Sequence, residues 1–202
     1  MRKVFLSIGS PSNEGQQVFI DSVKVMMETH GLKPLTADAS FARPFDNINL
    51  TMKKADAVIV IALERYFIPE LVERRNGTIR PKKKIREVYL PTTWNQVEAA
   101  MAHAWQLPLL VMCESCLRED GLLDRGNDWY MHRIETDGSS RPYIEDQLRR
   151  FSTEVHKRRR PFWQVWRSLD APGRIGLVAA LLGITSLLGT WGLSTLKLLL
   201  EG

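Results

Sequence analysis

Cysteine is scarce in this chain of 202 residues, which has only Cys113 and Cys116. So small a number argues against a secreted domain held together by disulfides and fits a reducing compartment. The two form a C-x-x-C sequence, but a zinc site needs about four ligands, and the four histidines do not have metal-ligand spacing. A thioredoxin-like pair would be expected to open a helix near the first strands, whereas this pair follows the fourth predicted strand. We predict two reduced thiols and no metal site.

The chain also lacks the motifs of several well-known hydrolases. It contains no G-x-x-x-x-G-K-[ST], no G-x-S-x-G and no H-E-x-x-H, so nothing supports hydrolysis by a P-loop or a conventional triad. There is no internal repeat and no low-complexity tract. The first apolar run, Val4 to Ile8, is too short for a signal peptide and leads into a polar turn. We therefore expect the chain to start in the cytoplasm.

Positive charge exceeds negative charge, with a formal net charge of +5 and an isoelectric point of about 9.4. The excess is local: one concentration is Arg74–Arg86 and the other is His156–Arg160. We interpret Arg80–Arg86 as a solvated loop, and the alternative is a phosphate-binding or lipid-facing patch. No nucleic-acid partner is expected.

Strand-like and helix-like segments alternate along the first 155 residues. Continuous apolar runs predict strands at Lys3–Ile8, Leu32–Thr36, Ala57–Leu63 and Leu109–Met112, with an edge strand at Trp129–Ile134. Amphipathic spacing predicts helices at Glu14–His30, Ile48–Lys54 and Tyr143–Val155. This alternation predicts an α/β fold with a mostly parallel five-stranded sheet, right-handed crossovers and helices on both faces, as in flavodoxin.

Shorter features complete this assignment. Gly31 is placed to cap the first helix, whose apolar positions are Val18, Val23, Met26 and Met27. We expect a turn at Phe41–Asp46, and at Tyr66–Arg75 a helical turn or two. The polar turn from Gly9 to Asn13 follows the first strand, where α/β sheets usually bind ligands, so Gly9 and Ser10 are candidate binding residues.

The stretch from Pro91 to Cys113 is predicted to be a capped helix that leads into a buried strand. Thr93 and Gln96 match the S/T-x-x-E/Q capping box. Glu98 falls in the second helical turn, on the same face as Trp94. A carboxylate beside an indole near the start of a helix is a candidate pocket group. The other interpretation is a solvated helical glutamate.

The C-terminal segment gives the strongest single signal. Ile175 to Leu196 is a run of about 22 residues without charge, and a helix of that length is roughly 33 Å long, enough to cross a bilayer. Basic residues and tryptophans precede the run, which predicts a single-pass tail anchor with the N-terminal domain in the cytoplasm. Ala179–Gly183 and Thr185–Gly189 are small-x-x-x-small pairs, so self-association through this helix is expected. The alternative is a hydrophobic helix buried against a partner.

Three segments carry a resemblance to a known family: V-F-L-S-I-G, A-D-A-V-I-V-I-A-L and T-T-W-N-Q-V-E-A-A-M-A-H-A-W-Q-L-P-L-L-V-M. Their order resembles the Toll/interleukin-1 receptor (TIR) domain and is similar to the related nucleoside 2-deoxyribosyltransferases. The TIR pattern of Ser, Trp and Glu falls on Thr92, Trp94 and Glu98. The transferases have Asp and Gly where this chain has Thr92 and Trp94, which departs from their pattern.

The resemblance covers roughly residues 3–155, so we assign residues 1–156 to a cytoplasmic domain of this type. The basic flank and the apolar run then assign 157–174 to a basic linker and 175–200 to a transmembrane helix. The resemblance also implies that Glu98 supports cleavage of the N-glycosidic bond of NAD or a related nucleotide, which is the substrate rather than a cofactor. Gly9, Ser10, Arg43 and Trp94 are the expected substrate-binding residues, with Arg43 as the phosphate partner. An oligomeric, membrane-bound immune or antiviral effector activated by clustering is the implied setting. The alternatives are a nucleotide second-messenger sensor that reorganises a bundle of transmembrane helices, and a non-catalytic TIR-type scaffold.

Overall fold

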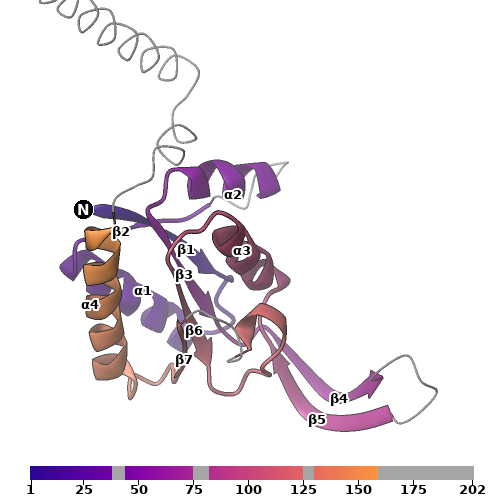
Figure 1. The fold of residues 1–202 in the computed structure, drawn as a ribbon. Helices are drawn as coiled ribbons and strands as arrows, with labels where there is room; N and C mark the ends of the chain where they lie inside the picture. The colour runs from indigo at the N-terminus through magenta and orange to yellow at the C-terminus, as the bar shows by residue number, and fades with distance from the viewer. Residues whose placement is uncertain (38–43, 75–81, 125–129, 159–202) are drawn as a thin grey trace, which may run out of the picture. The chain divides into compact units, whose positions relative to one another are not determined.

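Five parallel strands form the central sheet of the computed structural model, which describes residues 1–37, 44–74, 82–124 and 130–158 (Figure 1). The strands are β1 (Arg2–Ile8), β2 (Leu32–Leu35), β3 (Ala57–Ala62), β6 (Leu109–Glu114) and β7 (Tyr130–Ile134). Their order is β2-β1-β3-β6-β7, and every neighbouring pair is parallel. Numbered within the sheet alone, this is the flavodoxin-like order 2-1-3-4-5. The predicted α/β class and the five-stranded parallel sheet are confirmed.

In the described part of the chain, four α-helices cover the two faces of the sheet, as predicted. Helices α1 (Glu14–Thr29) and α4 (Arg141–Lys157) pack on one face, and α2 (Pro44–Lys53) and α3 (Thr93–Ala104) on the other (Figure 1). Successive side chains of a strand point to opposite faces, so a strand that is covered on both sides must be apolar throughout. All six residues of β3 are buried, which meets this requirement.

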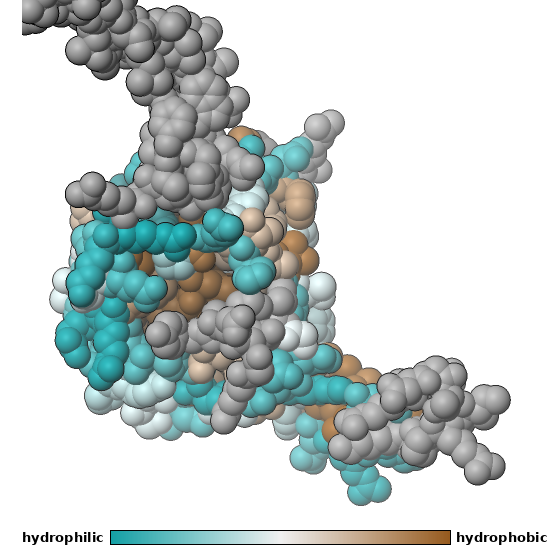
Figure 2. Space-filling view, in the orientation of Figure 1, coloured by the Kyte–Doolittle hydropathy of each residue, from teal (hydrophilic) through white to brown (hydrophobic). Residues whose placement is uncertain are grey.

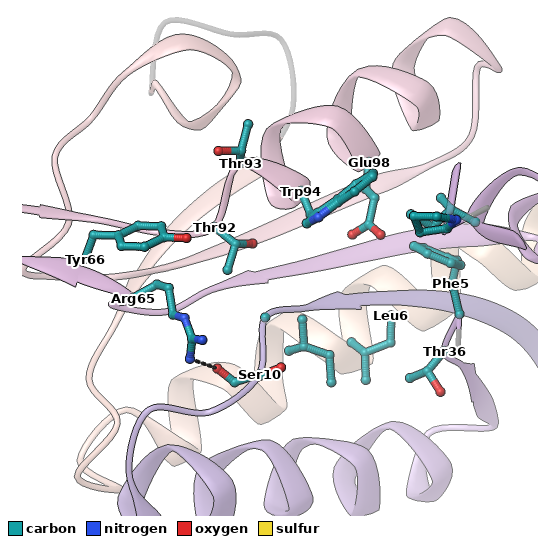
Figure 3. Close-up of a pocket in the computed structure, with 15 residues that line it drawn as sticks. Phe5, Leu6, Ser10, Thr36, Arg65, Tyr66, Thr92, Thr93, Trp94 and Glu98 are labelled. Atoms are coloured by element: carbon teal, nitrogen blue, oxygen red, sulfur yellow. Dashed lines mark hydrogen bonds between the residues drawn. The ribbon is translucent and has the colours of Figure 1, made fainter. Parts of the chain in front are cut away.

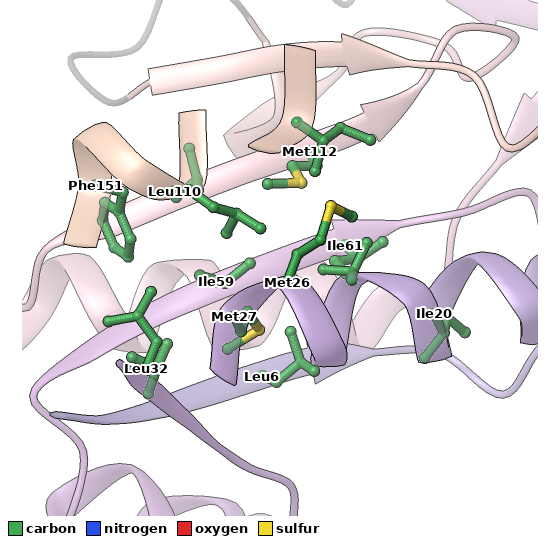
Figure 4. Packing of buried hydrophobic residues seen from close by; sticks show 14 of the residues in the cluster. Leu6, Ile20, Met26, Met27, Leu32, Ile59, Ile61, Leu110, Met112 and Phe151 are labelled. Atoms are coloured by element: carbon green, nitrogen blue, oxygen red, sulfur yellow. The ribbon is translucent and has the colours of Figure 1, made fainter. Parts of the chain in front are cut away.

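The core therefore divides into two layers. Figure 4 shows the layer under α1 and α4, where sheet side chains such as Ile59 and Met112 meet Met26, Met27 and Phe151. The other layer joins Phe5, Val58, Val60 and Val111 to the buried sides of α2 and α3. Each layer excludes water from aliphatic side chains and supplies most of the driving force for this arrangement.

Two predictions about helices need correction. Val18 does not belong to the buried face of α1, because 64% of its surface is exposed, whereas Val23 and Met27 are fully buried. Gly31 does follow the helix in the left-handed region, with φ of 75°, as expected of a glycine just after a C-cap. The predicted turn at Phe41–Asp46 is wrong for Pro44–Asp46, which open α2; the rest of it lies outside the described residues.

The segment between β3 and α3 differs most from the prediction. Tyr66–Arg74 is strand β4 rather than a helical turn, and Lys82–Leu90 is strand β5, which includes most of the predicted basic loop. The two pair antiparallel and project from the sheet as a hairpin (Figure 1). The stabilising contacts are cross-strand pairs, which no periodicity within either segment reveals. Apolar side chains stay half-exposed along the hairpin, among them Phe67 and Val72. Figure 2 shows brown, hydrophobic surface on this projecting part of the molecule.

The predicted membrane helix, residues 175–200, lies outside the described residues, and so does the predicted linker from residue 159 onward, whereas Lys157 is the last residue of α4. Within the described part of the chain, no helix combines the length and the apolar character needed to span a bilayer. The division into residues 1–156, 157–174 and 175–200 stays a prediction.

Candidate functional site

A cavity of about 610 Å³ opens where the carboxyl end of β1 faces the start of α3 (Figure 3). In a sheet of this order, the helices that follow β1 and β3 leave on opposite faces, so a crevice forms outside the ends of these two strands. The volume falls in the range of about 300–1,000 Å³ that small-molecule sites occupy. The turn after β1, the segment after β2, α2, the start of the hairpin and the start of α3 all contribute to the wall. The cavity therefore lies where the fold favours a ligand.

Glu98 reaches this cavity from the second turn of α3. The residue is only 7% exposed, and burial raises its pKa from 4.5 to about 7, because a charged carboxylate loses its hydration there. The Ser7 hydroxyl donates a hydrogen bond to Glu98, which opposes part of that rise. The solvated-glutamate interpretation is thus wrong. At neutral pH Glu98 exists in both protonation states.

A chain of hydrogen bonds connects the Glu98 carboxyl group to the start of its own helix. The Thr92 hydroxyl donates to Asn95 Oδ1 at 2.9 Å, and Asn95 Nδ2 donates to Ser7 Oγ at 3.1 Å. Asn95 also donates to the Ile61 carbonyl oxygen at 3.4 Å, which attaches α3 to β3. Because Ser7 Oγ accepts from Asn95, its own proton is directed to Glu98. The network fixes both the position of Glu98 and the direction of the hydrogen bond that it receives.

The start of α3 is capped differently from the prediction. The helix begins at Thr93 with Thr92 as N-cap, and Gln96 donates through Nε2 to the Asp120 carbonyl oxygen at 2.9 Å rather than folding back. The Thr93–Gln96 capping box is therefore wrong. Since the Thr92 hydroxyl is used by Asn95, the cap residue serves the network around Glu98.

Gly9 allows the turn after β1 to approach Thr92 closely. A Cβ on Gly9 would lie 2.7 Å from Thr92 Cγ2, far inside van der Waals contact. A glycine is needed here because of this close approach. Through it, the end of β1 and the start of α3 form one continuous wall of the cavity.

Four of the five predicted site residues line this single cavity: Gly9, Ser10, Trp94 and Glu98. They come from two segments about 85 residues apart in the chain, which the sheet brings together (Figure 3). The indole of Trp94 is 44% exposed at the rim beside Glu98, where a ligand can still cover it. The fifth residue, Arg43, lies outside the described residues. The roles assigned to these residues stay predictions.

Sequence reasoning missed Arg65 and Tyr66, which follow β3 and line the same cavity. Arg65 Nη1 donates to the Ser10 carbonyl oxygen at 3.4 Å, and the Arg65 backbone N–H donates to the Leu90 carbonyl oxygen at 2.9 Å. One signal was available: residues just beyond a central parallel strand lie at the edge where ligands bind. The prediction of a helical turn or two at Tyr66–Arg75 did not place Arg65 and Tyr66 at that edge.

The C-x-x-C pair is separate from the cavity lining. Cys113 is buried at the end of β6, Cys116 is exposed, and neither is in a disulfide. Burial raises the pKa of each thiol to about 11, so both remain protonated at neutral pH, unlike the thiolates of redox motifs. The described residues contain no cluster of three side chains suited to holding a metal ion.

Comparison with known proteins gives likenesses to solved structures alone. No family model matches the chain, and neither does a curated protein. Among solved structures, the chain is similar to the CMP N-glycosidase BcmB from Clostridium botulinum, with 15% sequence identity and a TM-score of 0.45. The similarity covers 72% of this chain and 98% of that one. At this identity the likeness concerns the α/β fold alone.

Proposed function

We propose that the cavity binds NAD or a related nucleotide and that Glu98 takes part in cleaving its N-glycosidic bond. One observation carries this proposal: a buried carboxyl group with a pKa of about 7 lines a cavity of about 610 Å³ at the switch point of the sheet. Carboxyl groups with such perturbed pKa values, placed in clefts, are frequent at functional sites.

The chemistry needs few groups. When the bond from C1′ to the base nitrogen breaks, the base leaves with the electron pair and the ribose becomes oxocarbenium-like. A fixed carboxylate stabilises that positive charge or forms a bond to C1′, and water then adds its oxygen to C1′ and releases a proton. From NAD, nicotinamide leaves as a neutral molecule, so no general acid has to protonate it. Glu98 in its ionised form supplies the carboxylate.

The neighbours of Glu98 have matching tasks in this proposal. Ser7 and Asn95 hold the carboxyl group, and the half-exposed ring of Trp94 provides a face for a base to stack on. Gly9 and Ser10 lie where backbone groups can approach a ribose or phosphate. The arrangement would bind and orient the nucleotide before the bond breaks.

The setting of this activity belongs to the same proposal. The uncharged run Ile175–Leu196 supports a membrane anchor, and its small-residue pairs support a homo-oligomer. An immune or antiviral role, with activation by clustering, rests on the resemblance to TIR domains. The residues involved lie outside the described part of the chain.

A nucleotide sensor is the second candidate. At neutral pH a pKa of about 7 leaves roughly half of the Glu98 carboxyl groups protonated, and a protonated carboxyl group can donate a hydrogen bond to a ligand without attacking it. In that case the ligand would bind, remain intact and change the packing of the membrane helices.

The test is release of free base from NAD and from a panel of nucleotides, measured by chromatography on the full chain in detergent and at high density in liposomes. Glu98→Gln is compared with Glu70→Gln, which changes a half-exposed glutamate on the hairpin. We expect release by the wild type and by Glu70→Gln but not by Glu98→Gln. Nucleotide binding without release in any variant would favour the sensor. If the chain neither binds nor cleaves any nucleotide, the remaining interpretation is the non-catalytic TIR-type scaffold.

A further inference from the structure

The cavity has a polar end and an apolar end. Phe5 lies at one end, whereas Ser10 and Arg65 lie at the other, with Glu98 between them in Figure 3. Phe5 and Ile8 are three residues apart on β1, a distance of about 10 Å along the strand, and Ser10 lies beyond its end. A ligand that fills the cavity therefore meets apolar side chains at one end and a positive charge at the other.

Arg65 supplies that charge from a fixed backbone position. Its N–H pairs with the Leu90 carbonyl oxygen at the base of the hairpin, and its guanidinium group contacts the Ser10 carbonyl oxygen. Among the described residues that line the cavity, Arg65 is the only lysine or arginine. A guanidinium group has five N–H donors, and its geometry matches two oxygens of a phosphate. Arg65 is exposed, so an incoming anion can reach it.

The arrangement also separates like charges. An anionic group close to Glu98 would be repelled by the carboxylate and would raise the cost of ionising it. At the Ser10 end, the same group would face Arg65 instead. The base of a nucleotide suits the apolar end near Phe5, where the Trp94 ring beside Glu98 offers it a face, and this leaves the sugar near Glu98.

We propose that Arg65 binds the 5′-phosphate of the nucleotide beside Ser10, so that this site selects nucleotides over nucleosides. The proposal rests on the proposed function for the position of the sugar at Glu98. The binding preference itself needs no turnover. It assigns to the hairpin a direct role in ligand selection, because Arg65 immediately precedes β4 (Tyr66–Arg74).

The experiment measures affinity by calorimetry for three matched pairs: adenosine and AMP, cytidine and CMP, and nicotinamide riboside and its mononucleotide. The full chain carries Glu98→Gln to prevent turnover. We expect at least one monophosphate to bind about tenfold more tightly than its nucleoside, as a charge-assisted contact implies. Arg65→Gln should remove most of that preference and leave nucleoside affinity unchanged, whereas Arg65→Lys should keep part of it. Arg86→Gln, an exposed change on the same hairpin, is the matched control and should have no effect.

The proposal is overturned if Arg65→Gln weakens a nucleoside and its monophosphate alike, if the preference survives it, or if no monophosphate binds. Base release by the otherwise unchanged chain is measured separately. A preference that depends on Arg65, without base release, supports the phosphate site and contradicts the proposed cleavage. Base release, together with a preference for monophosphates that Arg65→Gln leaves unchanged, supports the proposed cleavage and contradicts the phosphate site at Arg65.

Discussion

The parallel sheet and the β4–β5 hairpin use the same backbone hydrogen bonding but differ in what surrounds them. Every side chain of β3 is buried, whereas in the hairpin Val88 is buried while Tyr66, Phe67 and Val72 are about half-exposed. Burial makes sheet positions costly to change. Exposed hairpin positions are less constrained, so side chains such as Arg65, at its base, are available for ligand contacts. The sheet therefore fixes the position of the site, and residues at the base of the hairpin can vary to suit a ligand.

The largest expected effect is on stability, from truncation in the sheet. Ile59 is fully buried in the layer under α1 and α4, so Ile59→Ala should lower the free energy of unfolding by about 2–5 kcal/mol. Val72→Ala on the hairpin should change it by no more than about 0.5 kcal/mol. Urea denaturation followed by fluorescence measures both. Equal losses at the two positions would show that the hairpin tolerates truncation no better than the sheet.

The next effect depends on pH. The folded-state pKa of Glu98, about 7, lies above the ordinary value of 4.5, so the folded state binds more protons between these values and its stability falls as pH rises through them. The cost of ionising the buried group reaches about 3 kcal/mol above pH 7. Glu98→Gln removes this cost, so its stability relative to the wild type should increase between pH 5 and pH 8.5.

The hairpin offers the control for this pH effect. Glu70 forms a half-exposed ion pair with Lys84 at 2.9 Å, and Glu70→Gln should change stability by less than about 1 kcal/mol at either pH. Urea denaturation at the two pH values gives the comparison. Parallel pH profiles for wild type and Glu98→Gln would mean that Glu98 is not buried as described.

A smaller effect concerns the close approach at the end of β1. Gly9→Ala would place a Cβ at 2.7 Å from Thr92 Cγ2 and should cost about 1–3 kcal/mol of stability. Thr92→Ser lacks that methyl group but keeps the hydroxyl that donates to Asn95. The double variant should recover most of the loss in thermal unfolding. A double variant as unstable as Gly9→Ala would show that the clash lies elsewhere.

The smallest effect is expected on the hairpin, at a position where a glycine would stabilise the fold but is not required, unlike Gly9. Glu87 has φ of 53°, a left-handed conformation that is unfavourable for a residue with a Cβ. Glu87→Gly relieves this strain but adds backbone freedom to the unfolded chain, so stability should rise by at most about 1 kcal/mol. A loss of stability in thermal unfolding would indicate that the Glu87 side chain makes a stabilising contact.

The sequence allowed prediction of the sheet because buried parallel strands are continuous apolar runs. Two strands, Ala57–Ala62 and Leu109–Glu114, could therefore be predicted without knowing which strands they pair with. The sequence predicts a helical turn and a loop where the structure has the hairpin. Pro69, Glu70 and Glu73 interrupt the apolar pattern of β4. The pairing of β4 with β5 depends on contacts between two segments, which neither sequence shows by itself.

The same distinction applies to the candidate site. Glu98 and Trp94 share a helix face, so their proximity could be predicted from spacing. The placement of Arg65 depends on where the hairpin begins, and the hydrogen bond from Asn95 to Ser7 joins residues 88 positions apart. Burial of Glu98, which determines its pKa, follows from the packing of α3 on the sheet and could not be derived from the sequence alone.

The rate of base release from NAD, or from the best nucleotide of the panel, measured from pH 5 to pH 9, tests directly whether the Glu98 carboxylate performs the cleavage. Because the ionised carboxylate is the reactive form, the rate should rise with pH through an inflection near 7 and be abolished in Glu98→Gln. Base release that persists in a folded Glu98→Gln variant would show that Glu98 does not perform the cleavage.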